Sequence, residues 1–324
     1  MSEYFKVKLW GVRGSIPSAP SPQQWNQHFT ALISSQNETS GGKALPDFFN
    51  QNNVARVGGY GTATTCIEVT SPKSRIIIDG GTGIRSFSER LTQGYASIKG
   101  PHHIFMTHFH WDHIIGLPFF APHFIPGAEI HYYAVQEDLA ELIRGVFRKP
   151  YFPVPFEKLP SKIHFHLLEP RTPLKLDDLI ITPYKLDHPD PCWGFRVESQ
   201  GRVYSHCVDT EATRLTRQDL GSDLPLYQNV DLMYFDAQYT LPELAEKANW
   251  GHSASQVGLE IAFRENVKRI LFAHHDPGAH LAEIQNLKLE TQQYFDALSQ
   301  QVVHASTKVE WDFAMEGMEI VITG

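Results

Sequence analysis

The alternation of hydrophobic and polar residues predicts a chain of many short strands. Residues 4–12 (YFKVKLWGV) alternate as a strand with one buried face does. Residues 102–107 (HHIFMT) form a shorter apolar run typical of a buried strand. The same criteria predict strands at 65–70, 74–79, 129–135, 162–168, 179–186, 193–199, 202–208, 231–239, 267–273, 308–314 and 318–323.

Helices are predicted between these strands, at 84–94, 136–147, 253–266 and 281–302, and a short one from Trp111 that Pro118 ends. Strand-rich halves separated by helices favour two sheets packed face to face with helices outside. Neither an internal repeat nor a clear linker is visible, so we expect residues 1–324 to form a single domain. The polar, Pro/Gly/Asn-rich stretch 18–57 is predicted to be a surface insertion between two strands.

Composition narrows the classes of partner. The chain has 324 residues, of which 42% are hydrophobic and 20% charged, as in ordinary soluble enzymes. Its formal net charge of -8, without a long Lys/Arg run, argues against binding a nucleic-acid backbone and leaves room for a small anionic substrate. The N-terminus does not resemble a signal peptide, and no apolar run could span a bilayer. We therefore expect a cytoplasmic protein without a membrane partner.

Chemically active residues recur where predicted strands end. His108, His110, Asp112 and His113 follow the strand at 102–107, and three further residues each follow another strand: His188, Asp209 and His274. Imidazole and carboxylate are ligands for zinc, manganese or iron. The His-x-His pair directs both rings to one side, while the Asp-His pair can turn toward a second ion. An aspartate suits bridging two metals, and the water or hydroxide held between them is a nucleophile at neutral pH. The alternative is that these are separate polar residues of the surface or core. It is disfavoured because such residues recur at the ends of several strands.

This pattern, HxHxDH followed by a distant His, Asp and His, resembles the metallo-β-lactamase superfamily, from DGGTG (79–83) to LFAHHDP (271–277). The resemblance implies an α/β fold, the αββα sandwich of two mixed sheets with helices outside. It also implies two divalent ions, zinc first, with manganese or iron as alternatives. One ion would take His108, His110 and His188, the other Asp112, His113 and His274, with Asp209 bridging. Asp79 matches the family's buried structural aspartate. His275 remains an alternative to His274.

Three segments are similar to the phosphodiester-cleaving branch of that family and to ribonuclease Z: VDT (208–210), FDAQY (235–239) and GHSAS (251–255). A histidine held cationic by a carboxylate could protonate a leaving oxygen. The candidate catalytic residues are therefore Asp112, His252 and Asp236. The alternative for His252 is a cap on the helix beginning at 253.

Ribonuclease Z enzymes carry a transfer-RNA-gripping arm between the third-motif His and the bridging Asp. Here His188 and Asp209 are 21 residues apart, and two predicted strands fill the interval. We therefore expect a dinuclear hydrolase that cleaves a small or cyclic nucleotide-type phosphodiester by attack of a metal-bridging hydroxide, with transfer RNA disfavoured. The alternatives are a ribonuclease Z-like tRNA 3′ processing endonuclease, a thioester or lactone hydrolase, and a non-catalytic protein on the same fold.

Two aromatic, proline-rich loops, 116–127 and 149–156, lie close in sequence to the metal motif. A ring there, such as Phe119, Phe120, Tyr151 or Phe152, could stack on a base. The alternatives are loops that cover the core or a subunit interface of a homodimer.

Overall fold

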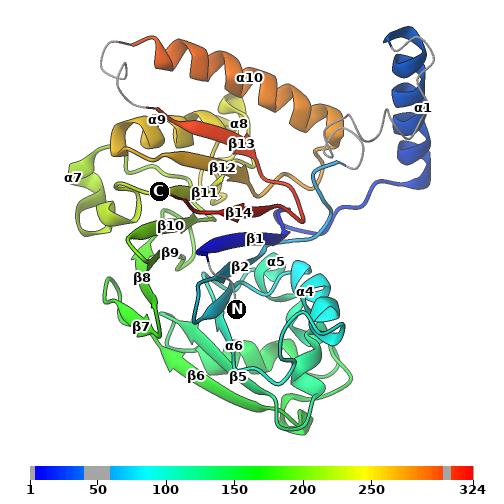
Figure 1. Cartoon of the computed structure of the whole chain (residues 1–324), viewed down its shortest axis with the longest axis vertical. Coiled ribbons are helices and arrows are strands. Elements are labelled where there is room, and N and C mark those ends of the chain that lie inside the picture. The colour runs from blue at the N-terminus through cyan, green and yellow to red at the C-terminus, as the bar shows by residue number, and fades with distance from the viewer. Residues whose placement is uncertain (1–3, 40–58, 302–307, 324) are drawn as a thin grey trace.

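The computed structural model describes residues 4–39, 59–301 and 308–323 (Figure 1). Within these residues two seven-stranded sheets pack face to face. In spatial order, the first sheet contains β14 (Glu319–Val321), β1 (Lys6–Gly11), β2 (Cys66–Thr70), β3 (Arg75–Ile78), β4 (His102–Phe105), β5 (Glu129–Ala134) and β6 (Lys162–Leu167). The second contains β13 (Glu310–Phe313), β12 (Arg269–Ala273), β11 (Leu232–Asp236), β10 (Arg202–Cys207), β9 (Trp193–Ser199), β8 (Leu179–Lys185) and β7 (Leu174–Leu176).

Both sheets contain parallel and antiparallel strands, and the direction of each strand determines at which edge of the sheet its carboxyl end lies. Strands β3 to β6 are parallel to one another, as are β10 to β13. Strand β8 is antiparallel to β9, which is antiparallel to β10, so β8 and β10 run in the same direction. Carboxyl ends of strands that run together meet at one edge of a sheet, where polar side chains can gather beside an apolar core.

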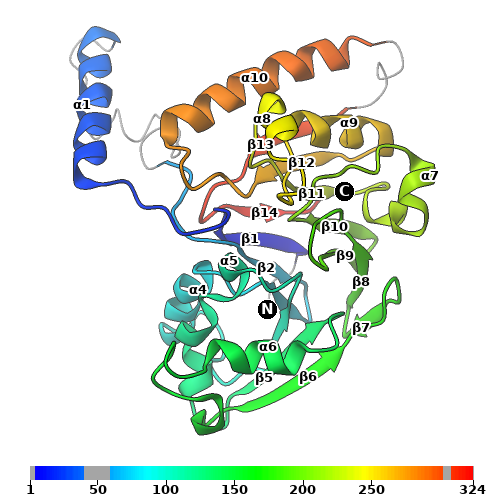
Figure 2. The same ribbon diagram turned by 180° about the vertical axis from the view of Figure 1, so that it is seen from behind.

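Helices cover the outer face of each sheet (Figures 1 and 2). The apolar layer between the sheets includes Phe105, Phe195 and Tyr234. A second layer lies under α4 (Gly83–Thr92) and α6 (Leu139–Val146), and a third under α9 (Ser255–Glu265) and α10 (Leu281–Ser299). Removing these apolar faces from water drives the layers together. The predicted αββα sandwich is confirmed.

Three described α-helices and one described strand were not predicted: α1 (Pro22–Thr39), α7 (Arg217–Leu220), α8 (Leu241–Glu246) and β7. Helix α1 lies in the segment expected to be an insertion, between β1 and β2, and projects beyond the sheets in both views (Figures 1 and 2). It begins at Pro22, a residue favoured in the first helical turn. The remainder of the helix could not be predicted, because its apolar residues do not gather clearly on one face. Residues 40–57 of the insertion lie outside the described residues.

Helix α8 has a sequence signal that the hydrophobic pattern does not show. The backbone N–H and hydroxyl of Thr240 both donate to the Glu243 carboxylate, as in a capping box. Strand β7 and helix α7 are too short to show a period. Among the described helices, none combines the length and the apolar character that crossing a bilayer requires.

Candidate metal centre

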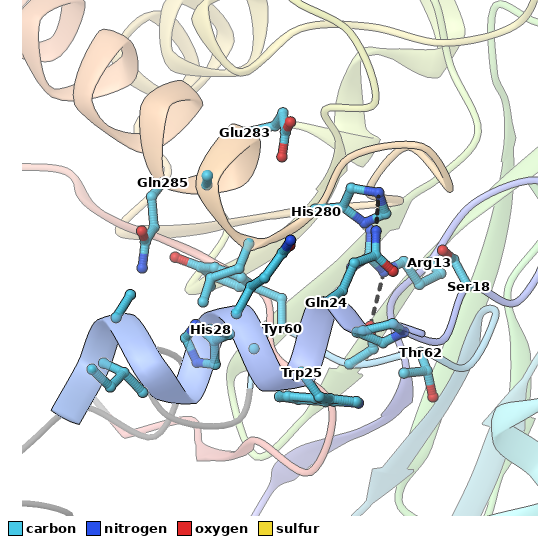
Figure 3. A pocket seen from close by; sticks show the side chains of 18 residues that line it. Arg13, Ser18, Gln24, Trp25, His28, Tyr60, Thr62, His280, Glu283 and Gln285 are labelled. Atoms are coloured by element: carbon cyan, nitrogen blue, oxygen red, sulfur yellow. Dashed lines mark hydrogen bonds between the residues drawn. The ribbon is translucent and has the colours of Figure 1, made fainter. Parts of the chain in front are cut away.

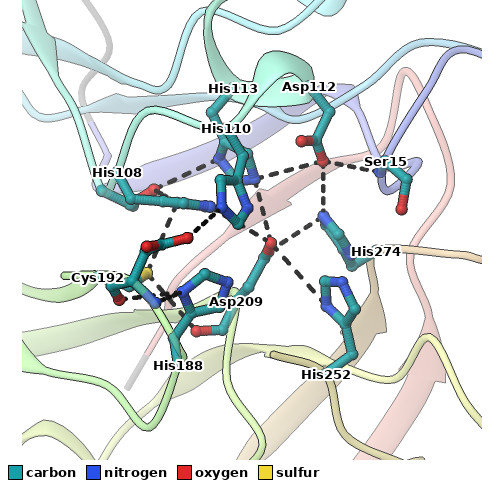
Figure 4. Close-up of polar contacts among 12 residues, drawn as sticks. Ser15, His108, His110, Asp112, His113, His188, Cys192, Asp209, His252 and His274 are labelled. Carbon is teal, nitrogen blue, oxygen red and sulfur yellow. Dashed lines mark hydrogen bonds and ion pairs between the residues drawn. The ribbon is translucent and has the colours of Figure 1, made fainter. Parts of the chain in front are cut away.

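Segments from both sheets meet at one edge of the sandwich (Figure 4). The first sheet contributes the segment after β4, in which His110 precedes the short helix α5 (Trp111–Ile114) that carries Asp112 and His113. The second sheet contributes His188 after β8, Asp209 after β10 and His274 after β12. The predicted strand-end residues are therefore brought together by the common direction of the strands that precede them.

The donor atoms form two sets that share one carboxylate. In each set the atoms lie within 4.8 Å of one another: His108, His110, His188 and Asp209 in the first, and Asp112, His113, Asp209 and His274 in the second. Figure 4 shows Asp209 in the middle of the cluster. This grouping matches the two ligand sets that the family resemblance implied, with Asp209 in the bridging position.

The contacts inside the cluster are close and strongly buried. His274 Nε2 lies 3.0 Å from Asp112 Oδ2 and 3.1 Å from Asp209 Oδ1. His113 Nε2 lies 3.4 Å from one oxygen of each of these two carboxylates. His108, Asp112, His113, Asp209 and His274 each expose 4% of their surface or less.

Several of these buried atoms lack hydrogen-bond partners. Nε2 of His108, His113 and His188 has none among the described residues, and Oδ1 of Asp209 has the ion-pair contact with His274 but no hydrogen bond. An unpaired buried polar atom costs free energy, so such atoms converging on one point need an explanation. Divalent cations would satisfy all four at once, and nitrogen with carboxylate oxygen is a donor set typical of zinc. The residues therefore fit the two metal ions that the fold implies.

The second ring nitrogen of these histidines is held by neighbouring groups. His113 Nδ1 donates to Asp79 Oδ2 at 2.8 Å, and His274 Nδ1 donates to Gln238 Oε1 at 2.7 Å. Such partners orient metal-binding imidazoles and select the tautomer whose Nε2 is free. Asp79 is fully buried and also accepts from the Thr107 N–H at 2.9 Å, so it lies beneath the cluster as the resemblance implied.

The two neighbouring histidines at the end of β12 face different surroundings. His274 faces the carboxylates, whereas His275 Nε2 donates to the Ala314 carbonyl at 2.7 Å and its ring stacks on Phe313. Burial lowers the pKa of His275 to about 3, so its ring is neutral and belongs to the core. The geometry favours His274 as the ligand, as predicted.

Opposite charges polarise the centre in the metal-free protein. Burial disfavours a charge on His113, but Asp112, Asp209 and Asp79 outweigh it and raise its pKa well above the ordinary value. For Asp209, burial is likewise outweighed by His274 and His113, which lower its pKa. For His108 burial dominates and lowers the pKa. The surplus carboxylate charge makes this a site for cations.

His252 and Asp236 form a pair beside the second ligand set. His252 Nδ1 lies 2.9 Å from Asp236 Oδ2 and 3.9 Å from Asp209 Oδ2, and its ring stacks on that of His274. Burial opposes protonation of His252, but Asp236 and Asp209 outweigh it and raise its pKa to about 9. The predicted partnership is present. The N-terminus of α9 is preceded by Ala254, so His252 is not its cap.

Three contacts around the centre were not predicted. Besides Gln238, the Ser15 N–H donates to Asp112 Oδ2 at 2.8 Å, and His110 Nε2 lies 2.9 Å from Asp190 Oδ2. Gly14, the second glycine of GVRGSIP (11–17), was a sequence signal for the approach of this segment to the centre. A Cβ at Gly14 would lie 2.3 Å from His274 Nδ1, so only glycine fits there. Asp190 carried no sequence signal.

The aromatic loops divide between core and surface. Phe120 is fully buried and stacks on Phe87, so base stacking by Phe120 is wrong. Phe119 and Tyr151 are exposed. Trp111, next to His110, and Trp250, next to Gly251, are also exposed.

A separate cavity of about 550 Å³ lies between α1 and the start of α10 (Figure 3). Its lining includes Trp25, His28, Tyr60 and His280, and none of the ligand residues. The Arg13 guanidinium at its wall donates to the carbonyls of Gly61, Asp276 and Ala279. Those bonds use three of its five N–H groups and tie Arg13 to the surrounding backbone, and we assign this cavity no part in the chemistry.

Comparisons with known proteins bear on the family and the fold of this chain. Residues 74–275, more than half of the chain, match the family described as "Beta-lactamase superfamily domain". A ribonuclease Z of Parabacteroides distasonis is 24% identical over 68% of this chain and 84% of that enzyme. Among solved structures, the metallo-beta-lactamase fold protein YhfI from Bacillus subtilis has a TM-score of 0.64 at 16% identity, covering 98% of this chain and 99% of YhfI. Unliganded yeast PDE1 has a TM-score of 0.63 at 14% identity, covering 99% of this chain and 100% of PDE1.

The two structures share the fold with this protein, and the family match covers the segments that carry the clustered histidines and aspartates. The resemblance found in the sequence is confirmed: the chain belongs to the β-lactamase superfamily and has its metallo-β-lactamase fold.

Proposed function

We propose that this protein hydrolyses a phosphodiester, with a small or cyclic nucleotide-type substrate favoured. The observation that carries the proposal is the His252–Asp236 pair, 2.9 Å apart, set directly against the shared carboxylate Asp209. Hydrolysis of a thioester or lactone needs the metals but gives such a pair no clear task.

The ligand sets described above would hold two divalent ions. Bound there, these ions would supply an activated water and offset negative charge at phosphorus. Zinc suits the sets best, and manganese and iron suit them as well. Asp112 belongs to the second ligand set and is also the third catalytic candidate. The Ser15 N–H donates to its Oδ2 at 2.8 Å and so fixes the carboxylate beside the activated water that the ions would supply.

His252 is placed to move a proton. Its Nδ1 is bound to Asp236, so its Nε2 is the nitrogen free to act. As the water oxygen bonds to phosphorus and the bond from phosphorus to the leaving oxygen breaks, Nε2–H donates its proton to that oxygen. Asp236 stabilises the imidazolium before transfer and is itself oriented by the Gln238 and Ser253 N–H groups, at 3.1 and 3.2 Å.

The relatives support phosphorus chemistry and favour a second candidate. Yeast PDE1, a phosphodiesterase by its name, shares the fold across the whole chain. The named ribonuclease Z relative supports a tRNA 3′ processing endonuclease instead. Against that candidate, β9 and β10 form a hairpin with only residues 200–201 between them, where ribonuclease Z carries its arm. The net charge of -8 also disfavours a long polyanion.

The test is hydrolysis of bis(p-nitrophenyl) phosphate by protein of measured metal content, with a thioester assayed alongside. We expect phosphodiester turnover, and we expect His252→Ala to lower it by about 10²–10⁴-fold with unchanged metal content. His280→Ala, an exposed histidine outside the centre, is the matched control and should keep full activity. Thioester turnover alone, indifferent to His252, would overturn the proposal.

A further inference from the structure

A second group of histidines lies on the first sheet and shares no residue with the centre described above. It occupies β5 and β6, with Glu129 and His131 two residues apart on β5 and therefore on one face of the sheet. The parallel register places His164 of β6 directly beside His131. Three strong metal donors are thus aligned by strand pairing.

The donor atoms of these residues converge. Glu129 Oε1 lies 3.3 Å from His131 Nε2 and 3.5 Å from His164 Nε2. All three donors lie within 4.8 Å of one another, and none belongs to the ligand sets at the strand ends. A tetrahedral zinc ion with bonds of about 2.1 Å holds its ligands roughly 3.4 Å apart. The observed spacing therefore suits a zinc-sized ion with little movement.

A further ring orients the central histidine. His131 Nδ1 lies 2.9 Å from His166 Nε2, so the Nδ1–H of His131 can donate to His166. The Nε2 of His131 then carries a lone pair, and this atom faces Glu129. His166 stacks on Tyr133, whose hydroxyl pairs with His103 Nδ1 at 3.0 Å. Outer partners of this kind are a regular feature of built metal sites, because they fix the tautomer of the ligand.

We propose that Glu129, His131 and His164 form an additional site for a borderline divalent metal ion of the zinc class. Two imidazoles and one carboxylate are an established zinc donor set, whereas magnesium and calcium prefer oxygen alone. The side chains of His131, Glu129 and His164 are 17%, 45% and 44% exposed, so an ion can reach them from solvent, and water would complete the coordination.

The site would have a mechanical consequence. Among the described strands, β6 is an edge of the first sheet and is hydrogen-bonded to β5 alone. An ion held by His164 and by two residues of β5 would link the edge strand to its neighbour (Figure 1). Binding to the folded state alone raises stability by mass action.

The experiment measures zinc content. Metal-free full-length protein is dialysed against micromolar free zinc, and bound zinc is determined by mass spectrometry. We expect His164→Gln and Glu129→Gln each to hold about one zinc ion per chain fewer than the wild type and the control His280→Gln. Both variants should keep their phosphodiesterase rate, because neither residue touches the catalytic cluster.

A second arm separates this site from the other centre. Asp209→Ala removes the shared carboxylate there, and in that background zinc should still raise the melting temperature, with the rise lost on adding His164→Gln. Equal zinc contents in the wild type, His164→Gln and Glu129→Gln would overturn the proposal, whatever the substrate of the enzyme proves to be.

Discussion

At the scale of single residues, the centre depends on which way each side chain turns. His274 and His275 are adjacent in the chain, yet one faces two carboxylates and the other a core carbonyl. The difference arises because His274 has a φ of +60°, a left-handed conformation uncommon outside glycine, which turns the backbone at the end of β12. Strained backbone of this kind is concentrated at functional sites.

This difference predicts opposite results for two neighbouring substitutions. We expect His274→Ala to hold about one metal ion per chain fewer and to lose phosphodiester hydrolysis, because it removes a ligand. His275→Gln keeps a donor for the Ala314 carbonyl and should retain full metal content. Metal analysis after identical purification checks both, and the reverse pattern would make His275 the ligand.

Gly251 gives a second prediction at this scale. Its φ is +91°, and a Cβ there would lie 2.3 Å from Cδ2 of the His188 ring. We expect Gly251→Ala to displace His188 and to lower both metal affinity and turnover by at least about tenfold.

Gly201 in the β9–β10 turn is the matched control for that substitution. Its φ is +73°, but a Cβ there would meet no atom of a non-adjacent residue within 4 Å, so Gly201→Ala imposes similar backbone strain without the clash. Metal titration and kcat of both variants make the comparison. Equal losses in the two would show that backbone strain, and not the contact with His188, is responsible.

At the scale of elements, the segment that carries His188 is anchored by a charge network behind β8. Arg214 donates to both Asp187, the residue before His188, and Asp223, and Arg171 binds Asp223 with two hydrogen bonds of 2.8 and 2.9 Å. Paired charge-assisted bonds of this kind hold geometry better than single ones. The loop position is thus set by residues that never touch the metal centre.

Asp223→Asn tests this anchor. Burial opposes the charged form of Asp223, but hydrogen bonds from Arg171 and Arg214 outweigh it and lower its pKa below 3.8. A lowered carboxyl pKa stabilises the fold above the unfolded value, and that stability is lost as pH falls through the folded value. We expect the variant to lose about 3 kcal/mol of unfolding free energy at pH 7.

The loss should shrink as the pH falls below about 4. Urea unfolding at several pH values measures it. Glu319→Gln, which breaks the more exposed pair with Lys6, is the control and should cost about 1 kcal/mol or less. A pH-independent loss in Asp223→Asn would assign its effect to packing.

At the scale of the whole molecule, two separate sheets each supply part of one site. The first provides the HxHxDH segment and the second provides His188, Asp209, Asp236 and His274. The apolar layer between the sheets therefore determines the distance between the two halves of the ligand sets. A change in that packing would alter the distances between the ligand atoms before it unfolded the chain.

The charge of the whole molecule predicts a small salt effect. The net charge is -8, and a two-residue turn lies where an arm would be, so we expect few phosphate contacts. We expect kcat/KM for bis(p-nitrophenyl) phosphate and for cyclic nucleotides to change by less than about threefold between roughly 50 and 200 mM NaCl.

A precursor transfer RNA assayed beside these substrates decides between the two candidate functions. A nuclease that makes six or more phosphate contacts loses about 10³-fold or more in affinity over that salt range. Efficient cleavage of the precursor with such a steep salt dependence would favour the ribonuclease Z function.

The sequence alone determined the fold class and the candidate ligands. Short-range patterns predicted the strands and the donor residues, because a two-residue hydrophobic period marks strands and HxHxDH places four donors within six positions. The resemblance to the metallo-β-lactamase superfamily implied the αββα sandwich and the two ligand sets. His188, Asp209 and His274 could be found because each directly follows such a strand. Elements with weak or short patterns, such as α1 and β7, could not.

Only the tertiary structure decided which groups face one another. Gln238 behind His274, the Ser15 N–H on Asp112, and the alignment of His131 with His164 all join segments far apart in the chain. The physical reason is that strand register and side-chain direction follow from the packing of the whole molecule. A local sequence pattern limits them to a few choices, and burial of the two sheets against each other selects among these.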